Sequence, residues 1–223
     1  MDTFASIFER AAERKGGADA LQDMLQVKPK TKAQLKKLSD AQVLAEMTKC
    51  VFRSGFVWKI IESKWPGFEK AFHDFDVARC AMLSDEELED LQQNTDIVRN
   101  AKKIHSVRRN AQFILEVRES HGGFGAYLAQ WPDDDFIGLW AELKGRGDRL
   151  GGQTGRFFLR FIGRDTPMFS TDVVRALVSQ GVVDKEPTSK SALKQTQEAF
   201  NHWREESGLS FNEISRVLAF SVP

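Results

Sequence analysis

No segment of this sequence shows the sustained apolar–polar alternation of a half-buried β-strand. Helical signals recur instead. Three segments open with the Ser-x-x-Glu/Gln spacing of a capping box, at Ser39, Ser84 and Ser210. Within residues 102–118 the apolar positions recur every three or four residues, as on the buried face of a helix. These patterns predict an all-α protein of about ten short helices, punctuated by glycine and proline.

The composition is that of a folded chain without cross-links. The chain has 223 residues, 41% of them hydrophobic, which is enough for a sizeable core. No apolar run approaches the roughly 20 residues that cross a bilayer, and the N-terminus has neither the basic start nor the apolar core of a signal peptide. Two isolated cysteines, Cys50 and Cys80, do not make a disulfide framework. We therefore expect a cytoplasmic protein that does not associate with membranes.

The net charge is zero, with 32 basic and 32 acidic residues, but the two signs are segregated along the chain. Residues 84–96 carry six acids and no base, whereas residues 99–109 carry five bases and no acid. Residues 144–164 carry six bases and a single acid, Asp148. One such run is typical of a solvated helix face. Two basic segments in a neutral protein nevertheless indicate a positive surface on one side of the molecule.

Common catalytic and metal-binding signatures are missing. Neither cysteine has a second metal ligand two to four residues away, and the histidines are scattered. The sequence contains no P-loop, no dinucleotide fingerprint and no Gly-x-Ser-x-Gly elbow. We therefore predict neither a metal nor a cofactor. The scattered histidines are His73, His105, His121 and His202.

The most informative segment is the glycine-rich turn within residues 143–163. It separates a helical segment ending near Lys144 from one beginning near Gln153. Glycine permits a positive φ and a close backbone approach, so the amides that open the second helix could bind a phosphate. An ordinary interhelical loop is the alternative, because glycine-rich turns are common. The candidate DNA-binding residues are Arg146, Arg149, Gly151, Gly152, Thr154 and Arg156.

This turn resembles the hairpin of the helix-hairpin-helix superfamily of base-excision DNA glycosylases, and specifically that of the DNA-3-methyladenine glycosylase I family. Two further segments are similar to this family: 54–76, which matches its base-pocket half, and 97–111, which matches one of its helices. The three matches follow the family's order over residues 47–175. The hairpin resemblance rests on Leu143, Lys144, Arg146, Gly147, Gly152, Thr154, Phe158 and Gly163.

The resemblance implies a two-lobed all-α fold, the helix-hairpin-helix DNA glycosylase fold, as a single domain over residues 1–223. The pocket helices would span about residues 39–80 and the hairpin unit about residues 143–163, with the N- and C-terminal helices forming the second lobe. Family members hold a zinc ion with cysteines and histidines near both ends. Here the first forty residues contain neither residue type, and the last forty contain only His202, so we expect no zinc.

The implied activity is that of a monofunctional glycosylase. Such an enzyme flips an alkylated purine such as 3-methyladenine out of double-stranded DNA and hydrolyses its N-glycosidic bond. A Schiff-base lyase step would need a lysine in the hairpin, and residues 147–154 contain none. We expect a monomer that is associated with the nucleoid when it is bound to DNA. The alternative is a non-catalytic DNA-binding protein of the same fold.

The family's pocket glutamate has no direct counterpart. Counting back from Trp58 without gaps places Cys50 at its position and leaves Glu46 one helical turn earlier. Phe52, Phe56 and Trp58 are the candidate base-pocket aromatics, at spacings that suit one helix face and could hold a cationic base. Such a stripe is more often core packing.

The wider superfamily also carries an aspartate at the start of the helix after the hairpin unit. Anchoring residues 169–175 on Arg175 puts Ser170 at that position, whereas the only carboxylate of the segment is Asp172. Asp172 is our first candidate for the catalytic carboxylate and Glu46 the second. A plain N-cap role for Asp172 or Thr171 is equally compatible with the sequence.

Overall fold

The computed structural model describes all residues from Met1 to Pro223 and contains fourteen α-helices, one 3₁₀ helix and no β-strand. The predicted all-α class is confirmed, although the helices outnumber the ten or so that were expected. No helix combines the length and the apolar character that a bilayer span requires.

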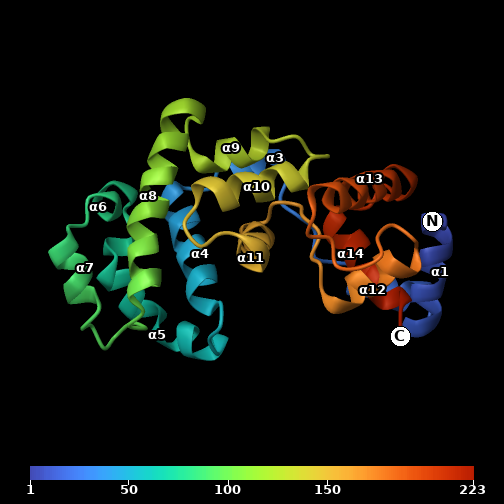
Figure 1. Ribbon diagram of the computed structural model, residues 1–223, viewed down its shortest axis with the longest axis horizontal. Coiled ribbons are helices and arrows are strands. Elements are labelled where there is room, and N and C mark those ends of the chain that lie inside the picture. Colours follow the sequence, from blue (N-terminus) through green and yellow to red (C-terminus); the bar gives the residue numbers. More distant parts are fainter. The chain divides into compact units, whose positions relative to one another are not determined.

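The chain divides into two compact units. The first consists of residues 1–30, 132–138 and 163–223, and the second of residues 31–131 and 139–162. The helices of the first unit are α1 (Phe4–Lys15), α2 (Ala18–Met24), α12 (Thr171–Ser179), α13 (Lys190–Ser207) and α14 (Phe211–Ser221) (Figure 1). The second unit contains α3 (Lys32–Lys36), α4 (Asp40–Arg53), α5 (Trp58–Ala71), η1 (His73–Phe75), α6 (Val77–Ala81), α7 (Asp85–Leu91), α8 (Ala101–His121), α9 (Phe124–Gln130), most of α10 (Phe136–Arg146) and α11 (Gly152–Ile162).

Local sequence signals set the helix ends. The three predicted capping boxes are confirmed, at the starts of α4, α7 and α14. The helix predicted within residues 102–118 is α8, which begins after the N-cap Asn100 and ends at Gly122 in the left-handed region, with φ 77°. Each cap satisfies backbone groups that a helix end would otherwise leave unpaired.

Helix α4 lies at the centre of the second unit, where it packs against both α8 and α11. Its buried positions include Met47, Val51 and Phe52, and the ring of Phe52 meets that of Phe68 edge to face at 4.6 Å. Burial of apolar side chains against two helices fixes the direction of the last turn of α4. Two side chains of that turn, those of Cys50 and Arg53, line a cavity.

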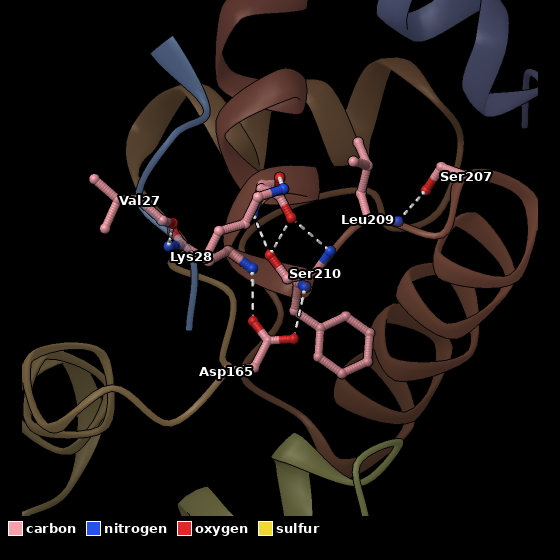
Figure 2. A network of polar contacts seen from close by, with 9 residues as sticks. Val27, Lys28, Asp165, Ser207, Leu209 and Ser210 are labelled. Carbon is pink, nitrogen blue, oxygen red and sulfur yellow. Dashed lines mark hydrogen bonds and ion pairs between the residues drawn. The ribbon is translucent and has the colours of Figure 1, made fainter. Parts of the chain in front are cut away.

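A half-buried carboxylate, that of Asp165, joins segments of the first unit at the start of α14. Asp165 accepts hydrogen bonds from the backbone N–H groups of Phe211 and Asn212, at 2.9 and 3.0 Å (Figure 2). The side-chain amide of Asn212 donates in turn to the carbonyl of Val27 at 3.2 Å. Burial raises the pKa of Asp165, and the two amide donors oppose that rise. The network joins three distant segments and has an evident structural role.

Candidate active site

The hairpin predicted from the glycines is present in the second unit. Residues 147–151 connect the end of α10 to the start of α11, within two residues of the predicted boundaries. Gly152 has a φ of 58°, a region that side-chain-bearing residues avoid. Gly155 serves a different purpose: a Cβ there would lie 2.1 Å from the carbonyl oxygen of Leu150. The helix and the loop backbone therefore approach each other closely.

The hairpin loop is clamped to α8. The buried amide of Asn110 donates to the carbonyl of Asp148 at 3.1 Å and accepts from the N–H of the same residue at 2.8 Å. Arg109 adds an ion pair to the Asp148 carboxylate at 3.0 Å. Arg149, the next residue, has a φ of 63° and an exposed side chain. These bonds hold the loop in one conformation, which its flexible glycines alone would not select.

The three arginines predicted to contribute charge to the hairpin differ in environment. Arg146 forms ion pairs with Glu116 at 3.1 Å and with Glu142 at 2.9 Å, so its charge is largely neutralised. The guanidinium of Arg156 lies 4.0 Å from the ring centroid of Trp140. Arg149 forms no ion pair. It therefore carries the least neutralised charge of the three.

Helices α4, α5 and α11 enclose a cavity of about 240 Å³. Trp58 forms one side, and its ring meets Phe157 and Phe161 edge to face, at centroid distances of 5.5 and 5.9 Å. Phe157 and Phe161 stack on each other along α11. The cavity therefore has an aromatic wall formed by three rings. The lining residues are Cys50, Arg53, Ser54, Gly55, Trp58, Gln153, Thr154, Phe157 and Phe161.

The structure separates the three aromatic residues that the sequence grouped together. Trp58 lines the cavity, whereas Phe52 is fully buried in the core and Phe56 lies beneath the ammonium group of Lys103, 4.4 Å away. The expectation that they share one helix face is wrong, because α4 ends at Arg53 and α5 begins at Trp58. Sequence reasoning missed Phe157 and Phe161, although their i,i+4 spacing on α11 marks one face of that helix.

Glu46 lies directly behind the cavity wall. Its carboxylate accepts a hydrogen bond from the thiol of Cys50, with 3.5 Å between Sγ and Oε1. Burial and the neighbouring Glu46 carboxylate raise the pKa of Cys50, so the thiol keeps its proton and acts as the donor. The position aligned with the family's glutamate is thus held by a thiol that hydrogen-bonds a carboxylate one turn away.

Arg53 occupies the aromatic side of the cavity. Its guanidinium lies 5.0 Å from the ring centroid of Trp58 and 5.1 Å from that of Phe161. It pairs with Glu62 and stands 3.8 Å from Glu46. Lys49 also pairs with Glu62, at 2.9 Å. Two cations and two carboxylates balance in this network, so it adds no net charge to the cavity.

Asp172 belongs to the first unit, in the first turn of α12. Its carboxylate stands 3.5 Å from the guanidinium of Arg175, and its side chain is about half exposed. The N-cap of α12 is Ser170, whose hydroxyl accepts the N–H of Val173 at 3.3 Å. The alternative N-cap role for Asp172 or Thr171 is therefore wrong, since Ser170 fills that position.

The residues present do not fit a zinc site of the kind the family resemblance implies. No group of three or more His, Cys, Asp and Glu side chains is arranged to hold a metal ion. Both cysteines are buried free thiols. Cys80 donates to the carbonyl of Phe72 at 3.1 Å, and burial raises its pKa to about 12.

Comparison with known proteins finds similarity to one family of DNA glycosylases. The methyladenine glycosylase family matches residues 34–143, from α3 to α10. DNA-3-methyladenine glycosylase 1 of Escherichia coli (strain K12) is 28% identical over 68 residues, which are 30% of this chain and 36% of that protein. The aligned part thus spans little more than a third of the relative's length.

Three solved structures share the fold. A 3-methyladenine DNA glycosylase I superposes with a TM-score of 0.51 at 22% identity, over 61% of this chain and 81% of its own. The Staphylococcus aureus 3-methyladenine DNA glycosylase I gives 0.51 at 20% identity, over 70% and 90%. The Methanocaldococcus jannaschii 8-oxoguanine DNA glycosylase gives 0.58 at 17% identity, over 96% and 92%. Residues 34–143 thus match the methyladenine glycosylase family, and the chain shares the helix-hairpin-helix fold of these DNA glycosylases.

Proposed function

We propose that this protein is a monofunctional DNA glycosylase that hydrolyses the N-glycosidic bond of alkylated purines such as 3-methyladenine in double-stranded DNA. One observation carries the proposal: α11 starts at the hairpin and also supplies two of the three rings in the aromatic wall of the cavity. At 1.5 Å per residue, Phe157 lies about 7.5 Å along the helix from Gly152. A phosphate bound at the start of α11 would thus hold a flipped nucleotide close to the cavity.

The cavity suits a flat cationic base. A purine methylated at N3 carries a positive charge in the nucleotide, so its glycosidic bond is already activated and the leaving base needs little protonation. The faces of Trp58, Phe157 and Phe161 would attract that charge. The cavity volume of about 240 Å³ lies below the range of about 300–1,000 Å³ for drug-sized ligands. This size favours a ligand with one fused ring system, such as a purine base.

Two carboxylates remain candidates for steadying positive charge on the sugar. Glu46 is supported by its hydrogen bond to Cys50, which lines the cavity. Asp172 is supported by the superfamily pattern and by its place in the first turn of α12, where the helix dipole favours an anion. A preorganised anion of this kind stabilises the charge that develops in the transition state. We propose Asp172 first and Glu46 second.

The partner we propose is double-stranded DNA with alkylated bases, bound by a monomer in the cytoplasm. The residues proposed to contact DNA are Arg146, Arg149, Gly151, Gly152, Thr154 and Arg156. The three arginines differ in expected contribution, because Glu116 and Glu142 already neutralise Arg146. No lyase step is proposed, because residues 147–154 offer no lysine for a Schiff base.

The test is release of free base from methylated duplex DNA, measured by chromatography of the released purines. We expect 3-methyladenine to appear, with strands left uncut until the abasic sites are cleaved by alkali. Trp58→Ala should lower the release rate while duplex binding persists. Duplex binding without base release, by a folded wild-type protein, would instead establish the non-catalytic DNA-binding alternative.

A further inference from the structure

A second cavity, of about 370 Å³, lies between the first turns of α8 and the hairpin loop. It is separate from the aromatic cavity and shares no lining residue with it. Helix α8 contributes two to three turns of its surface, and the loop contributes two consecutive residues. The lining residues are Ala101, Lys102, His105, Arg109, Asp148 and Arg149.

The lining is predominantly basic. Lys102, Arg109 and Arg149 have exposed side chains, and His105 is half-buried beside them. Asp148 is the one carboxylate in the lining, and it is already paired with Arg109. No carboxylate lies within ion-pair distance of Lys102 or Arg149. The cavity therefore holds positive charge that the protein itself does not neutralise.

Burial and the positive charge beside the cavity together lower the pKa of a nearby buried ammonium group, that of Lys103. The ammonium of Lys103 donates to the carbonyls of Phe52 and Ser54, at 3.1 and 2.6 Å. Burial lowers the pKa of Lys103 to about 8, and the charge of Arg149 contributes to that fall. Arg149 therefore adds positive potential to this side of the hairpin.

The cavity is preformed rather than dependent on a ligand. Both hydrogen bonds between Asn110 and the backbone of Asp148 join its two walls. A binding site whose backbone is already fixed loses less conformational entropy when its ligand arrives. The cationic side chains on that fixed frame are mostly exposed, which suits an extended polyanion better than a small anion enclosed on all sides.

We propose that this basic cavity, bounded by Lys102, His105, Arg109 and Arg149, binds a backbone phosphate of DNA as a second anchor beside the amides of the hairpin. The proposal rests on the proposed function, since it takes duplex DNA as the partner. It assigns a function to the basic run at the start of α8, which the aromatic cavity leaves unexplained. A phosphate here would replace Asp148 as the partner of Arg109.

The test compares duplex binding by the wild-type protein with that of Lys102→Gln and Asp148→Asn. Binding is measured by fluorescence anisotropy between 50 and 200 mM salt, a range in which phosphate contacts dominate the salt dependence. Lys102→Gln should weaken binding to any duplex sequence and reduce the salt slope by roughly one. Asp148→Asn should tighten binding, because it removes the carboxylate that competes for Arg109.

Lys36→Gln is the matched control, since it removes one exposed lysine charge from α3 of the same unit. If Lys102→Gln binds like the wild type, or no more weakly than Lys36→Gln, the second anchor is refuted while the proposed glycosylase stands. A wild-type protein that does not bind duplex DNA refutes both.

Calorimetric titration with inorganic phosphate tests whether the cavity instead binds a free phosphate ion. Phosphate binding that Lys102→Gln abolishes, without any change in DNA affinity, would assign the cavity to a free anion and overturn the proposal.

Discussion

Glu46 accepts a hydrogen bond from Cys50, one turn further along α4, and Cys50 lines the aromatic cavity. The pair puts a carboxylate one side chain away from the cavity surface. Where the family's glutamate would stand, this chain has a protonated thiol and, behind it, an anion that also faces Arg53 at 3.8 Å.

Asp172→Asn should lower base release by about 10² to 10³, the usual cost of one preorganised electrostatic group. Duplex affinity and the unfolding temperature should stay near the wild type, because Asp172 is half exposed and pairs only loosely with Arg175. Single-turnover assays on methylated duplex measure the rate. If Asp172→Asn keeps full activity and Glu46→Gln abolishes it, Glu46 is the catalytic carboxylate.

Free 3-methyladenine should quench the fluorescence of Trp58, a residue that is 42% exposed and lines the cavity. The quenching should disappear in Trp58→Phe. Phe161→Ala should weaken the affinity for the base because it removes part of the opposing aromatic wall. Trp131→Phe is a suitable control, since this tryptophan does not line the cavity. Equal quenching in the wild type and in Trp58→Phe would place the base elsewhere.

Arg149→Ala and Arg146→Ala should differ in their effect on DNA binding. Arg149 has no ion-pair partner, so its loss should reduce the salt slope by roughly one. Arg146 is already paired with Glu116 and Glu142, so its loss should change the slope far less. Anisotropy titrations at several salt concentrations give both slopes. Equal slopes for the two variants would contradict the idea that the free charge resides on Arg149.

Two of the hairpin glycines, Gly152 and Gly155, should respond differently to alanine. Gly155→Ala puts a Cβ 2.1 Å from the carbonyl oxygen of Leu150 and should destabilise the fold. Gly152→Ala meets no atom within 4 Å and costs only its left-handed backbone, about 1–2 kcal/mol. It should therefore stay folded while the shifted amides bind duplex DNA more weakly. Thermal unfolding and anisotropy separate the two effects, and unchanged binding by Gly152→Ala would make the turn an ordinary loop.

Lys103 should make stability depend on pH in the alkaline range. Its pKa is about 8 in the folded protein against 10.5 as the reference value, so between these pH values the unfolded chain binds more protons. The free energy of unfolding therefore gains a term from this residue that rises with pH from about 8 to 10.5 and is constant outside that window. Lys103→Met should show a flatter slope there in denaturant titrations. Identical slopes in the two proteins would contradict the lowered pKa.

Local interactions explain why so much of the fold could be predicted from the sequence. Ser84 and Glu87 satisfy each other's backbone groups three residues apart, and the apolar positions of α8 repeat along one helix. Gly152 of the hairpin likewise acts through its own positive φ angle. The all-α class, the capped helix starts and the hairpin are therefore visible in the sequence, and the family resemblance adds their order.

Tertiary packing decided the composition of the candidate site. Trp58 meets Phe157 and Phe161 about a hundred positions further along the chain, because α11 packs on α4, and no local pattern encodes that encounter. The same holds for charge: Glu116 on α8 neutralises Arg146, whereas nothing neutralises Arg149 three residues away. The sequence by itself determined the helices, the hairpin and the supply of basic and aromatic side chains. Only the tertiary structure decided which rings form the cavity and which charges stay free, because both depend on long-range contacts made when helices pack.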